Sequence, residues 1–528
     1  MSDEDKKKQP MGDEADEKKS APKGEDRDES DEDDSEADES KEENKAVKPA
    51  EKAKPAEKAK PAEKAKPAEK AKPAEAMPYA LNSKWSGLWK VFAGIGGVGV
   101  IGAIVGYTQN PERFAYSWLF GFLVALTIAI GSMMWVLIQY LTSAGWSVTV
   151  RRTAEFFASG SVAFVVLIIP VLLSMNTLFA GWLHIGEHHE GKAEVSLADA
   201  SHQVPQELAV NDRGQVNDGP GAVPGIMPDH AAPTKVGTSK YGDPEEHVEE
   251  QSMKAKTWWL TKNFFLVRAA IYVLFWMFLG NWLLRRSVMQ DTSKDPKVTV
   301  QTASMAPVMT ILLAFTLTGG AFDWIMSLEP TWYSTIFGVN FFASSFVAIH
   351  SVLIITLFQM RQNGMLTKEV NVEHFHDLGK LQFGFLVFWA YISFSQFMLI
   401  WYAAIPEEVT WYHHRWDVGP WAFVSMALLI LHFVVPFFLI ISRNIKRKIE
   451  LLAIGAMIIL AMHVVELYWF VMPNLPKQEE FAFSWIDIVC LIGPVGVYLA
   501  VVFRNMASHP IIPVGDPRLS RALKFVNQ

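Results

Sequence analysis

Ten long apolar runs dominate the chain from Leu88 onward, and polar stretches separate them. Each run is long enough for the about 20 residues that a helix needs to cross a bilayer. The runs cover approximately residues 88–108, 114–141, 153–176, 262–284, 302–326, 334–360, 379–403, 419–442, 450–472 and 483–504. The pattern predicts an all-α polytopic membrane protein, in which 81–184 supplies three transmembrane helices and 258–510 supplies seven.

Lysine and arginine are distributed unevenly over the connections between these runs. Nineteen, among them Arg151 and Arg152, lie on the N-terminal side, against Arg113, Arg415 and Lys477 in the short loops of the opposite side. Because cytoplasmic loops carry the excess of basic residues, both termini are predicted to be cytoplasmic, including a C-terminal tail at 511–528. The long segment 185–257 is then external, and its length is typical of a docking surface.

The first 80 residues contrast with the apolar region. Residues 25–43 are almost wholly charged, and 49–72 are four copies of PAEKAK. Repeated proline blocks a continuous helix, and neither stretch has enough apolar surface to offset the entropy of ordering. We therefore predict a disordered cytoplasmic tail over 1–80. Residues 1–76 hold 25 acidic and 18 basic side chains and so carry nearly all of the net charge of −8, which gives no indication of nucleic-acid binding.

Two motifs suggest cofactor chemistry but favour a simpler interpretation. Gly94–Gly99 reads GIGGVG, the dinucleotide-binding pattern, yet no strand precedes it, and a face for close helix packing accounts for it better. His184, Glu187, His188 and His189 could hold a metal only on a helix, and we predict no metal site. Cys490 is the single cysteine, so the chain has no thiol set for an iron–sulfur cluster and no CxxCH for c-type haem. Any redox centre is therefore expected to be held non-covalently or by histidine, and a quinone is possible.

Ionisable side chains recur inside the apolar runs between Gly319 and Glu466. Such groups are costly at membrane depth and mark paths for ions, protons or ligands. At about 1.5 Å per residue they fall at different depths, from Asp323 near the external face to His350 toward the cytoplasm. His463 and Glu466 are one helical turn apart, so they can meet. We predict a proton relay from the residues Asp323, His350, His432, His463 and Glu466, although for each histidine a satisfied core hydrogen bond remains an alternative.

A second polar group gathers near the predicted external face. Its members Glu407, His413, His414 and Asp417 are candidates for binding a quinone or another cofactor there. Arg268 lies about two turns below that face, and it either anchors the helix at the interface or pairs with Asp323 or Asp487.

The central region also shows an internal echo. Thr331-Trp332-Tyr333 recurs as Thr410-Trp411-Tyr412, and His350 and His432 each stand eleven residues before an arginine. An even number of helices separates the copies, so they would share one orientation, as parallel repeats do in other membrane proteins. The echo indicates a duplication as one interpretation.

Four long strings resemble a known family. They are FDWIMSLEPTWYSTIFG (322–338), HDLGKLQFGFLVFWAYISFSQFMLIWYAAIPEE (376–408), GPWAFVSMALLILHFVVPFFLIISR (419–443) and HVVELYWFVMP (463–473). From about residue 80 onward the chain resembles the NrfD-like membrane subunits of alternative complex III, a bacterial quinol:cytochrome c oxidoreductase, and is most similar to the ActF-type subunit.

The resemblance implies both architecture and role. It implies two four-helix bundles plus two further helices, in the bacterial inner membrane. The implied partners are a sister NrfD-like subunit, an iron–sulfur subunit and c-type haem subunits. It also implies a proton-conducting path, whereas a quinone pocket in this chain is less directly implied.

Two alternatives of other classes stay open. A secondary transporter would also have ten helices, a parallel repeat and buried charges. A b-type haem protein could use His350, His432 and His463 as iron ligands.

Overall fold

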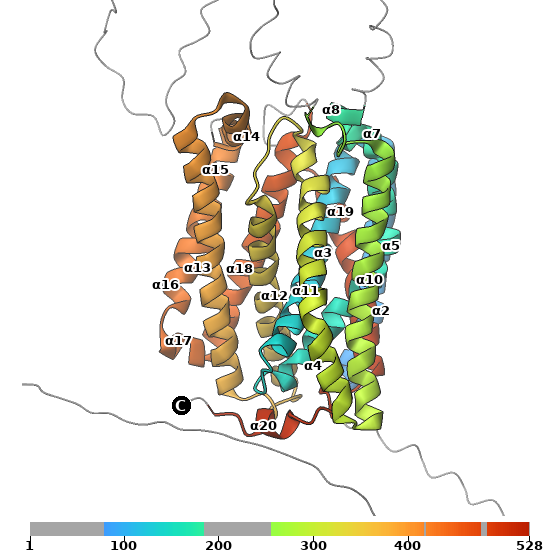
Figure 1. The fold of residues 1–528 in the computed structure, drawn as a ribbon, viewed down its shortest axis with the longest axis vertical. Helices are drawn as coiled ribbons and strands as arrows, with labels where there is room; N and C mark the ends of the chain where they lie inside the picture. The colour runs from blue at the N-terminus through green and yellow to red at the C-terminus, as the bar shows by residue number, and fades with distance from the viewer. Residues whose placement is uncertain (1–78, 184–254, 417–418, 477–482, 527–528) are drawn as a thin grey trace, which may run out of the picture. The chain divides into compact units, whose positions relative to one another are not determined.

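The computed structural model describes residues 79–183, 255–416, 419–476 and 483–526 (Figure 1). Helices dominate these residues, and no strand occurs among them. Nearly all of the predicted tail at 1–80 and of the predicted external segment at 185–257 lies outside the described residues, as does the histidine cluster that begins at His184.

Ten helices in the described part of the chain are long and apolar enough to cross a membrane, which confirms the predicted number. Four of them are the single long elements α3 (Pro111–Leu141), α12 (Phe337–Gln362), α18 (Ile449–Val471) and α19 (Trp485–Ser508). Four others are α2 (Leu88–Gln109, preceded by α1, Ser83–Ser86), α10 (Lys262–Ser293), α11 (Pro296–Trp324) and α13 (Val372–Ala403).

Two spans are broken into shorter elements. One consists of α4 (Val148–Ser159), η1 (Gly160–Ala163), α5 (Phe164–Leu167) and α6 (Ile169–Leu173), and the other of α15 (Gly419–Ala427), the π-helix η3 (Leu428–Val434) and α16 (Val435–Ile440). The connecting elements are α7 (Met175–Leu178), α8 (Ala180–Leu183), η2 (Met326–Leu328), α14 (Pro406–Trp416), α17 (Arg443–Arg447), η4 (Met472–Asn474) and α20 (Leu519–Leu523).

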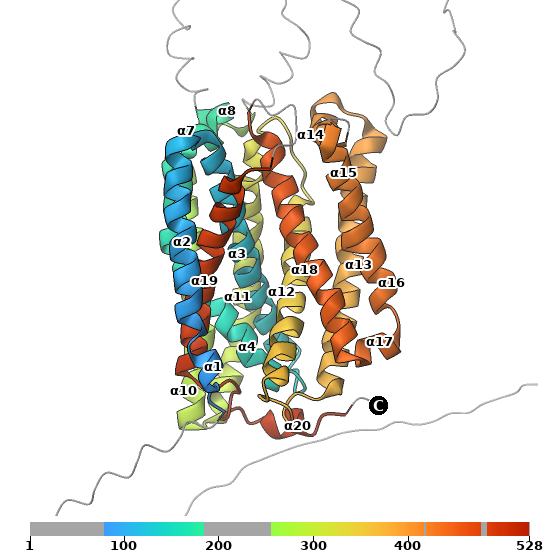
Figure 2. The ribbon, with the colours of Figure 1, turned by 180° about the vertical axis from the view of Figure 1, so that it is seen from behind.

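Helix contacts close two rings of four. The first ring contains α3, α4, α10 and α11, and the second contains α12, α13, α16 with η3, and α18. Helices α2 and α19 pack against each other, and α19 also contacts α3 (Figures 1 and 2). The described residues therefore form the predicted two four-helix bundles plus two helices.

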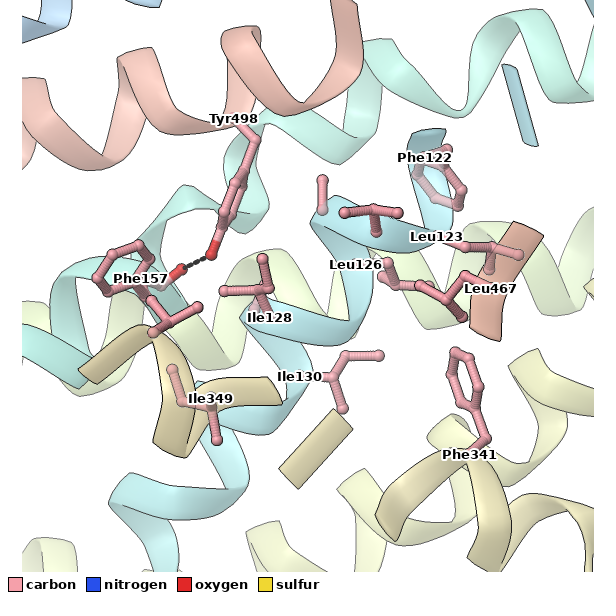
Figure 3. Packing of buried hydrophobic residues seen from close by; sticks show 14 of the residues in the cluster. Phe122, Leu123, Leu126, Ile128, Ile130, Phe157, Phe341, Ile349, Leu467 and Tyr498 are labelled. Carbon is pink, nitrogen blue, oxygen red and sulfur yellow. Dashed lines mark hydrogen bonds between the residues drawn. The ribbon is translucent and has the colours of Figure 1, made fainter. Parts of the chain in front are cut away.

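Helix α3 lies at the junction of these groups. Its most apolar stretch is 94% buried, compared with 17% for the span that contains α2. Figure 3 shows buried side chains of α3 beside those of the second ring: Leu123, Leu126 and Ile130 of α3 lie near Phe341 of α12 and Leu467 of α18. Because α3 contacts both rings, its side chains join the two bundles into one core.

Glycines let α2 approach α19 closely. A Cβ at Gly99 would lie 2.4 Å from the Gly493 nitrogen, and one at Gly96 would lie 2.7 Å from the Val497 nitrogen. Small residues at such spacing allow helix backbones to touch in a membrane. The predicted packing role of the Gly94–Gly99 run is therefore confirmed.

One end of the bundle, which carries α17 and α20, is here called the α20 end, and the opposite end, which carries α8 and α14, the α14 end (Figure 1). The predicted loop position of Arg151 is wrong, because this residue lies fully buried inside α4. Its guanidinium pairs with Glu155 at 2.9 Å and with Asp516 at 2.7 Å. Arg152, also placed in a loop, is likewise buried in α4 and pairs with Glu155 and Asp291.

The described part of the predicted C-terminal tail, 511–526, packs against the α20 end. Ile511 and Ile512 are buried, and the Asn371 amide donates to the Phe525 carbonyl at 3.0 Å. A Cβ at Gly515 would lie 1.9 Å from the Gln290 carbonyl oxygen, so only glycine permits this close approach to α10. Local sequence did not show this packing, because the residues that hold the segment lie on distant helices.

Candidate proton-transfer site and adjoining cavity

The predicted pair on α18 is formed. His463 Nδ1 lies 3.5 Å from Glu466 Oε2, and both side chains are buried. The Ser344 hydroxyl on α12 donates to Glu466 Oε2 and lies 2.9 Å from His463 Nδ1. On the other carboxylate oxygen, Trp389 Nε1 of α13 donates to Oε1 at 2.7 Å. Side chains from three helices therefore surround one buried carboxylate.

Thr127 of α3 completes the cluster on the far side of the imidazole. Its hydroxyl oxygen lies 2.9 Å from His463 Nε2 and 3.1 Å from the Val124 carbonyl oxygen. When His463 is neutral with its proton on Nδ1, the hydroxyl can donate to Nε2. When Nε2 is also protonated, the hydroxyl can rotate, donate to Val124 and accept from Nε2. The cluster can thus gain or lose a proton at His463 without leaving a hydrogen-bonding atom unpaired.

His432 lies beside this cluster on the π-helix. Its ring packs on the Trp389 ring with centroids 4.1 Å apart, and the same indole donates to Glu466. Neither ring nitrogen of His432 has a hydrogen-bond partner within the described residues, although the side chain is fully buried. In an α-helix the His432 carbonyl would accept a hydrogen bond from the N–H of residue 436, but Pro436 has no N–H. A π-turn, in which the carbonyl pairs with the residue five positions on, can replace that hydrogen bond. The local irregularity thus falls at the residue that faces the cluster.

His350 continues the polar side chains of α12 toward the α20 end. It lies six residues, or about 9 Å, beyond Ser344. Its Nδ1 is 2.6 Å from the Phe346 carbonyl oxygen, while Nε2 lacks a partner in the described part of the chain. One residue further on, Ser351 accepts from the Gln382 amide at 2.9 Å. His350 therefore has one satisfied core hydrogen bond and one open nitrogen.

A cavity of about 400 Å³ adjoins Glu466. Aromatic rings dominate its lining, and Glu466, Gln396 and Tyr412 are among its polar groups. The Gln396 amide donates to the Tyr412 hydroxyl at 3.3 Å. Phe394 is 62% exposed and Leu429 is 48% exposed, so the lining reaches the outer surface between α13 and η3. Apolar pockets with a few converging polar groups are typical of small-molecule sites.

Asp323 lies apart from the cluster, in a closed ion pair. Arg268 donates to both carboxylate oxygens at 2.7 and 2.8 Å, and Trp259 Nε1 donates to Oδ1 at 2.8 Å. This contact decides the alternatives for Arg268 in favour of a pair with Asp323. Asp487 has its own partner, since Arg113 donates to it at 3.0 and 2.6 Å. With every oxygen engaged by a cation, Asp323 is suited to holding helices together rather than to carrying protons.

The predicted external cofactor residues belong to the α14 end. His413 is half-buried, and the exposed His414 has its Nδ1 3.6 Å from Glu329 Oε1. Neither histidine lines the cavity. The Glu407 side chain and Asp417 lie outside the described residues. His413 and His414 are therefore not brought together with the cavity, whose α14 lining comes from Trp411, Tyr412 and Trp416.

The internal echo has a structural counterpart at this end. Trp332 and Trp411, the central residues of the two Thr-Trp-Tyr copies, stack with ring centroids 4.5 Å apart and an interplanar angle of 11°. Arg415 lies over the other side, with its guanidinium carbon 3.8 Å from the Trp411 ring centroid. Burial lowers the pKa of Arg415 to about 10, although Glu329 opposes the shift. The second copy of the motif thus lines the cavity through Trp411 and Tyr412, and Trp332 of the first copy stacks on Trp411.

Sequence reasoning missed Thr127, Ser344 and Trp389. The small hydroxyl residues stand out weakly inside apolar helices, and Trp389 is one of 19 tryptophans. Their roles follow only from which face of α3, α12 and α13 turns toward α18.

Metal ligation finds no support at these positions. Among the residues that the structure describes, no group of three or more His, Cys, Asp or Glu side chains could hold a metal ion. Comparison of the chain with protein-family models gives no match, and comparison with curated protein sequences gives none either.

Proposed function

We propose that this chain is a membrane subunit of a respiratory quinol:cytochrome c oxidoreductase in a bacterial inner membrane and that it conducts protons through the His463–Glu466 cluster. The observation that carries the proton role is the hydrogen-bonding of His463, which accommodates two protonation states. The resemblance of the four sequence strings supports the assignment to the complex, with its sister NrfD-like, iron–sulfur and c-type haem subunits as partners.

The proton step depends on Glu466 and His463 together. A carboxylate beside an imidazole can exchange one proton with it, and Ser344 bridges the two groups. The Trp389 indole holds Glu466 Oε1 and so keeps Oε2 directed toward Ser344 and His463. The local geometry therefore gives one proton a path between His463 and Glu466 through the Ser344 hydroxyl.

His432 and His350 are proposed as the next stations. Buried polar atoms nearly always have hydrogen-bond partners, and ordered water commonly supplies them where protein does not. The unpartnered nitrogens of His432 and His350 are therefore positions where water would link the cluster to the α20 end. Because the predicted orientation makes this end cytoplasmic, protons would enter there and reach Glu466 from below the cavity.

The cavity is the proposed place for a quinone headgroup. Its aromatic lining suits a planar ring, and Tyr412 and Glu466 can hydrogen-bond ring oxygens. Its reach to the outer surface at Phe394 and Leu429 suits entry from lipid. This replaces the external residues Glu407, His413, His414 and Asp417 as the first choice for a quinone site.

The haem alternative finds less support in this geometry. Both ring nitrogens of His463 are engaged by hydroxyl groups, whereas His432 and His350 keep nitrogens without a partner among the described residues, so the geometry argues against His463 alone as an iron ligand. An axial ligand needs a free ring nitrogen directed at an open space.

Replacement of Glu466 by Gln tests the proposal. The amide keeps the size of the side chain and an acceptor for Trp389, but it cannot titrate. In the assembled complex, reconstituted into vesicles, quinol-driven proton movement should fall by about tenfold or more, in the range that loss of one proton-transfer group causes. Glu373→Gln is the matched control, because Glu373 is a carboxylate of the second bundle that pairs with Arg447 at the α20 end. If Glu466→Gln and His432→Ala both assemble and retain wild-type proton movement and turnover, the relay is wrong.

A further inference from the structure

A groove on the outer face of α10 combines apolar side chains with two arginines. It has a volume of about 580 Å³ and lies between α10 and η1. Val162, Met277, Phe278 and Met289 line its apolar part, and Arg285 and Arg286 line its cationic part. This site has no role in the proton path.

The shape of the groove follows from a close helix approach. A Cβ at Gly280 would lie 2.2 Å from the Ala158 carbonyl oxygen and 2.6 Å from Ser161 Oγ, so α10 touches α4 and η1 there. Outward of this contact, Val162 is 40% exposed and Phe278 is 52% exposed. The two side chains line the groove on either side, from η1 and from α10.

The charges in the groove have no acidic counterpart. Within the described ranges, Arg285 makes no hydrogen bond or ion pair, and Arg286 donates only to neutral acceptors on α11, the nearest being Gln301 Oε1 at 2.8 Å. Guanidinium groups bind phosphate oxygens in a bidentate manner. Two uncompensated guanidiniums beside an apolar groove therefore complement an anion with a hydrocarbon tail.

The position along α10 fits a membrane surface. Exposed apolar residues follow one face of the helix, and they are Phe264, Val267, Ile271, Leu274 and Phe278. From Phe264 to Arg285 the helix rises about 32 Å, close to the about 30 Å thickness of the hydrocarbon core. Trp282, also in the groove, is a residue type enriched at the headgroup level. Arg285 thus falls where lipid phosphates lie.

We propose that this groove binds one anionic phospholipid, with its phosphate on Arg285 and Arg286 and one acyl chain along Phe278, Met277 and Val162. The positive-inside distribution places the groove in the cytoplasmic leaflet, where a polybasic surface attracts anionic headgroups. This inference is independent of the proposed proton path.

Photolabelling tests the site. The full chain is placed in phosphatidylcholine vesicles that contain a trace of phosphatidylglycerol with a diazirine on one acyl chain, and labelled peptides are mapped. Labelling should concentrate on 277–289 and exceed that by the same probe with a phosphocholine headgroup by on the order of tenfold, as two favourable charges imply. Arg285→Gln/Arg286→Gln should abolish the excess, and Arg285→Gln alone should reduce it without removing a contact within the protein.

Arg443→Gln/Lys448→Gln is the matched control, because both residues are exposed at the α20 end beside the second bundle and the change removes the same charge. It should leave labelling of 277–289 unchanged. Equal labelling by the two headgroups would overturn the proposal, as would labelling that Arg285→Gln/Arg286→Gln leaves intact. Loss of labelling in the assembled complex would show that a protein subunit covers this face, and would also overturn it.

Discussion

Replacement of Asp323 by Asn probes whether that carboxylate is structural. The change removes the negative charge that accepts both hydrogen bonds from Arg268, whose side chain is only 6% exposed. Removal of one partner of a buried ion pair leaves the other charge uncompensated and costs about 3–5 kcal/mol. The ring of Trp259, 4.0 Å from the guanidinium carbon, and the Trp259 carbonyl remain as partners, so we expect the lower end, about 3 kcal/mol.

A double-mutant cycle measures this contribution. Unfolding of the purified chain in mixed micelles is followed by tryptophan fluorescence for wild type, Asp323→Asn, Arg268→Met and the double variant. Because removing both charges avoids the unpaired state, the double variant should recover most of the lost stability. In the assembled complex, Asp323→Asn should leave proton movement per turnover unchanged. Stability within about 0.5 kcal/mol of wild type, the range of ordinary surface substitutions, would refute the structural role.

Three further predictions concern packing, pH and topology. Gly99→Val should lower the free energy of unfolding by about 1–3 kcal/mol, because its Cβ would collide with Gly493. Gly97→Val is the control and should be close to neutral, because no atom lies within 4 Å of its Cβ position. Equal unfolding midpoints for the two variants would contradict the close packing. Burial raises the pKa of Asp516, but Arg151 and Arg518 lower it by more, so its native pKa lies below the ordinary value. Its stabilising contribution should therefore be complete above about pH 4 and decline as the pH falls through the native pKa, and acid titrations of wild type and Asp516→Asn that run parallel would argue against it. A cysteine at Asn217 should react with a membrane-impermeant thiol reagent in intact cells, because the segment 185–257 is predicted to be external. The native Cys490 is buried and should contribute little labelling. Labelling that appears only after lysis would show that the predicted orientation is wrong.

Much of the fold could be predicted because consecutive residues encode it. The number of spans follows from hydropathy, and a close-packing face on α2 follows from the glycines of the first run, although its partner α19 does not. The start of α4 could not be predicted in this way. Arg151 and Arg152 look like loop residues, and inside the helix they pair not only with Glu155 of α4 but also with Asp516 and Asp291 on distant segments. Hydropathy is a local quantity, whereas the compensation of a buried charge is not.

The candidate site shows the same division. His463 and Glu466 could be paired from their spacing on one helix, since helical geometry alone brings them together. The contacts of Ser344 and Trp389 could not be predicted, because they depend on which face of α12 and of α13 turns toward α18. Both helices are apolar nearly all round, so their sequences do not specify that face. Depth placed both Asp323 and Arg268 near the external face and made their pairing one alternative, but depth alone could not choose between that ion pair and a relay position for Asp323.

The link between α4 and Asp516 also constrains biosynthesis. Arg151 and Asp516 are 365 residues apart in the chain. At about 5–20 residues per second, the ribosome adds Asp516 roughly 20–70 s after Arg151. During that interval Glu155, and later Asp291 on α10, are the carboxylates that can pair with the two arginines. The first bundle can therefore insert early, but the charge balance of its α20 end is completed only when translation has passed the last transmembrane helix.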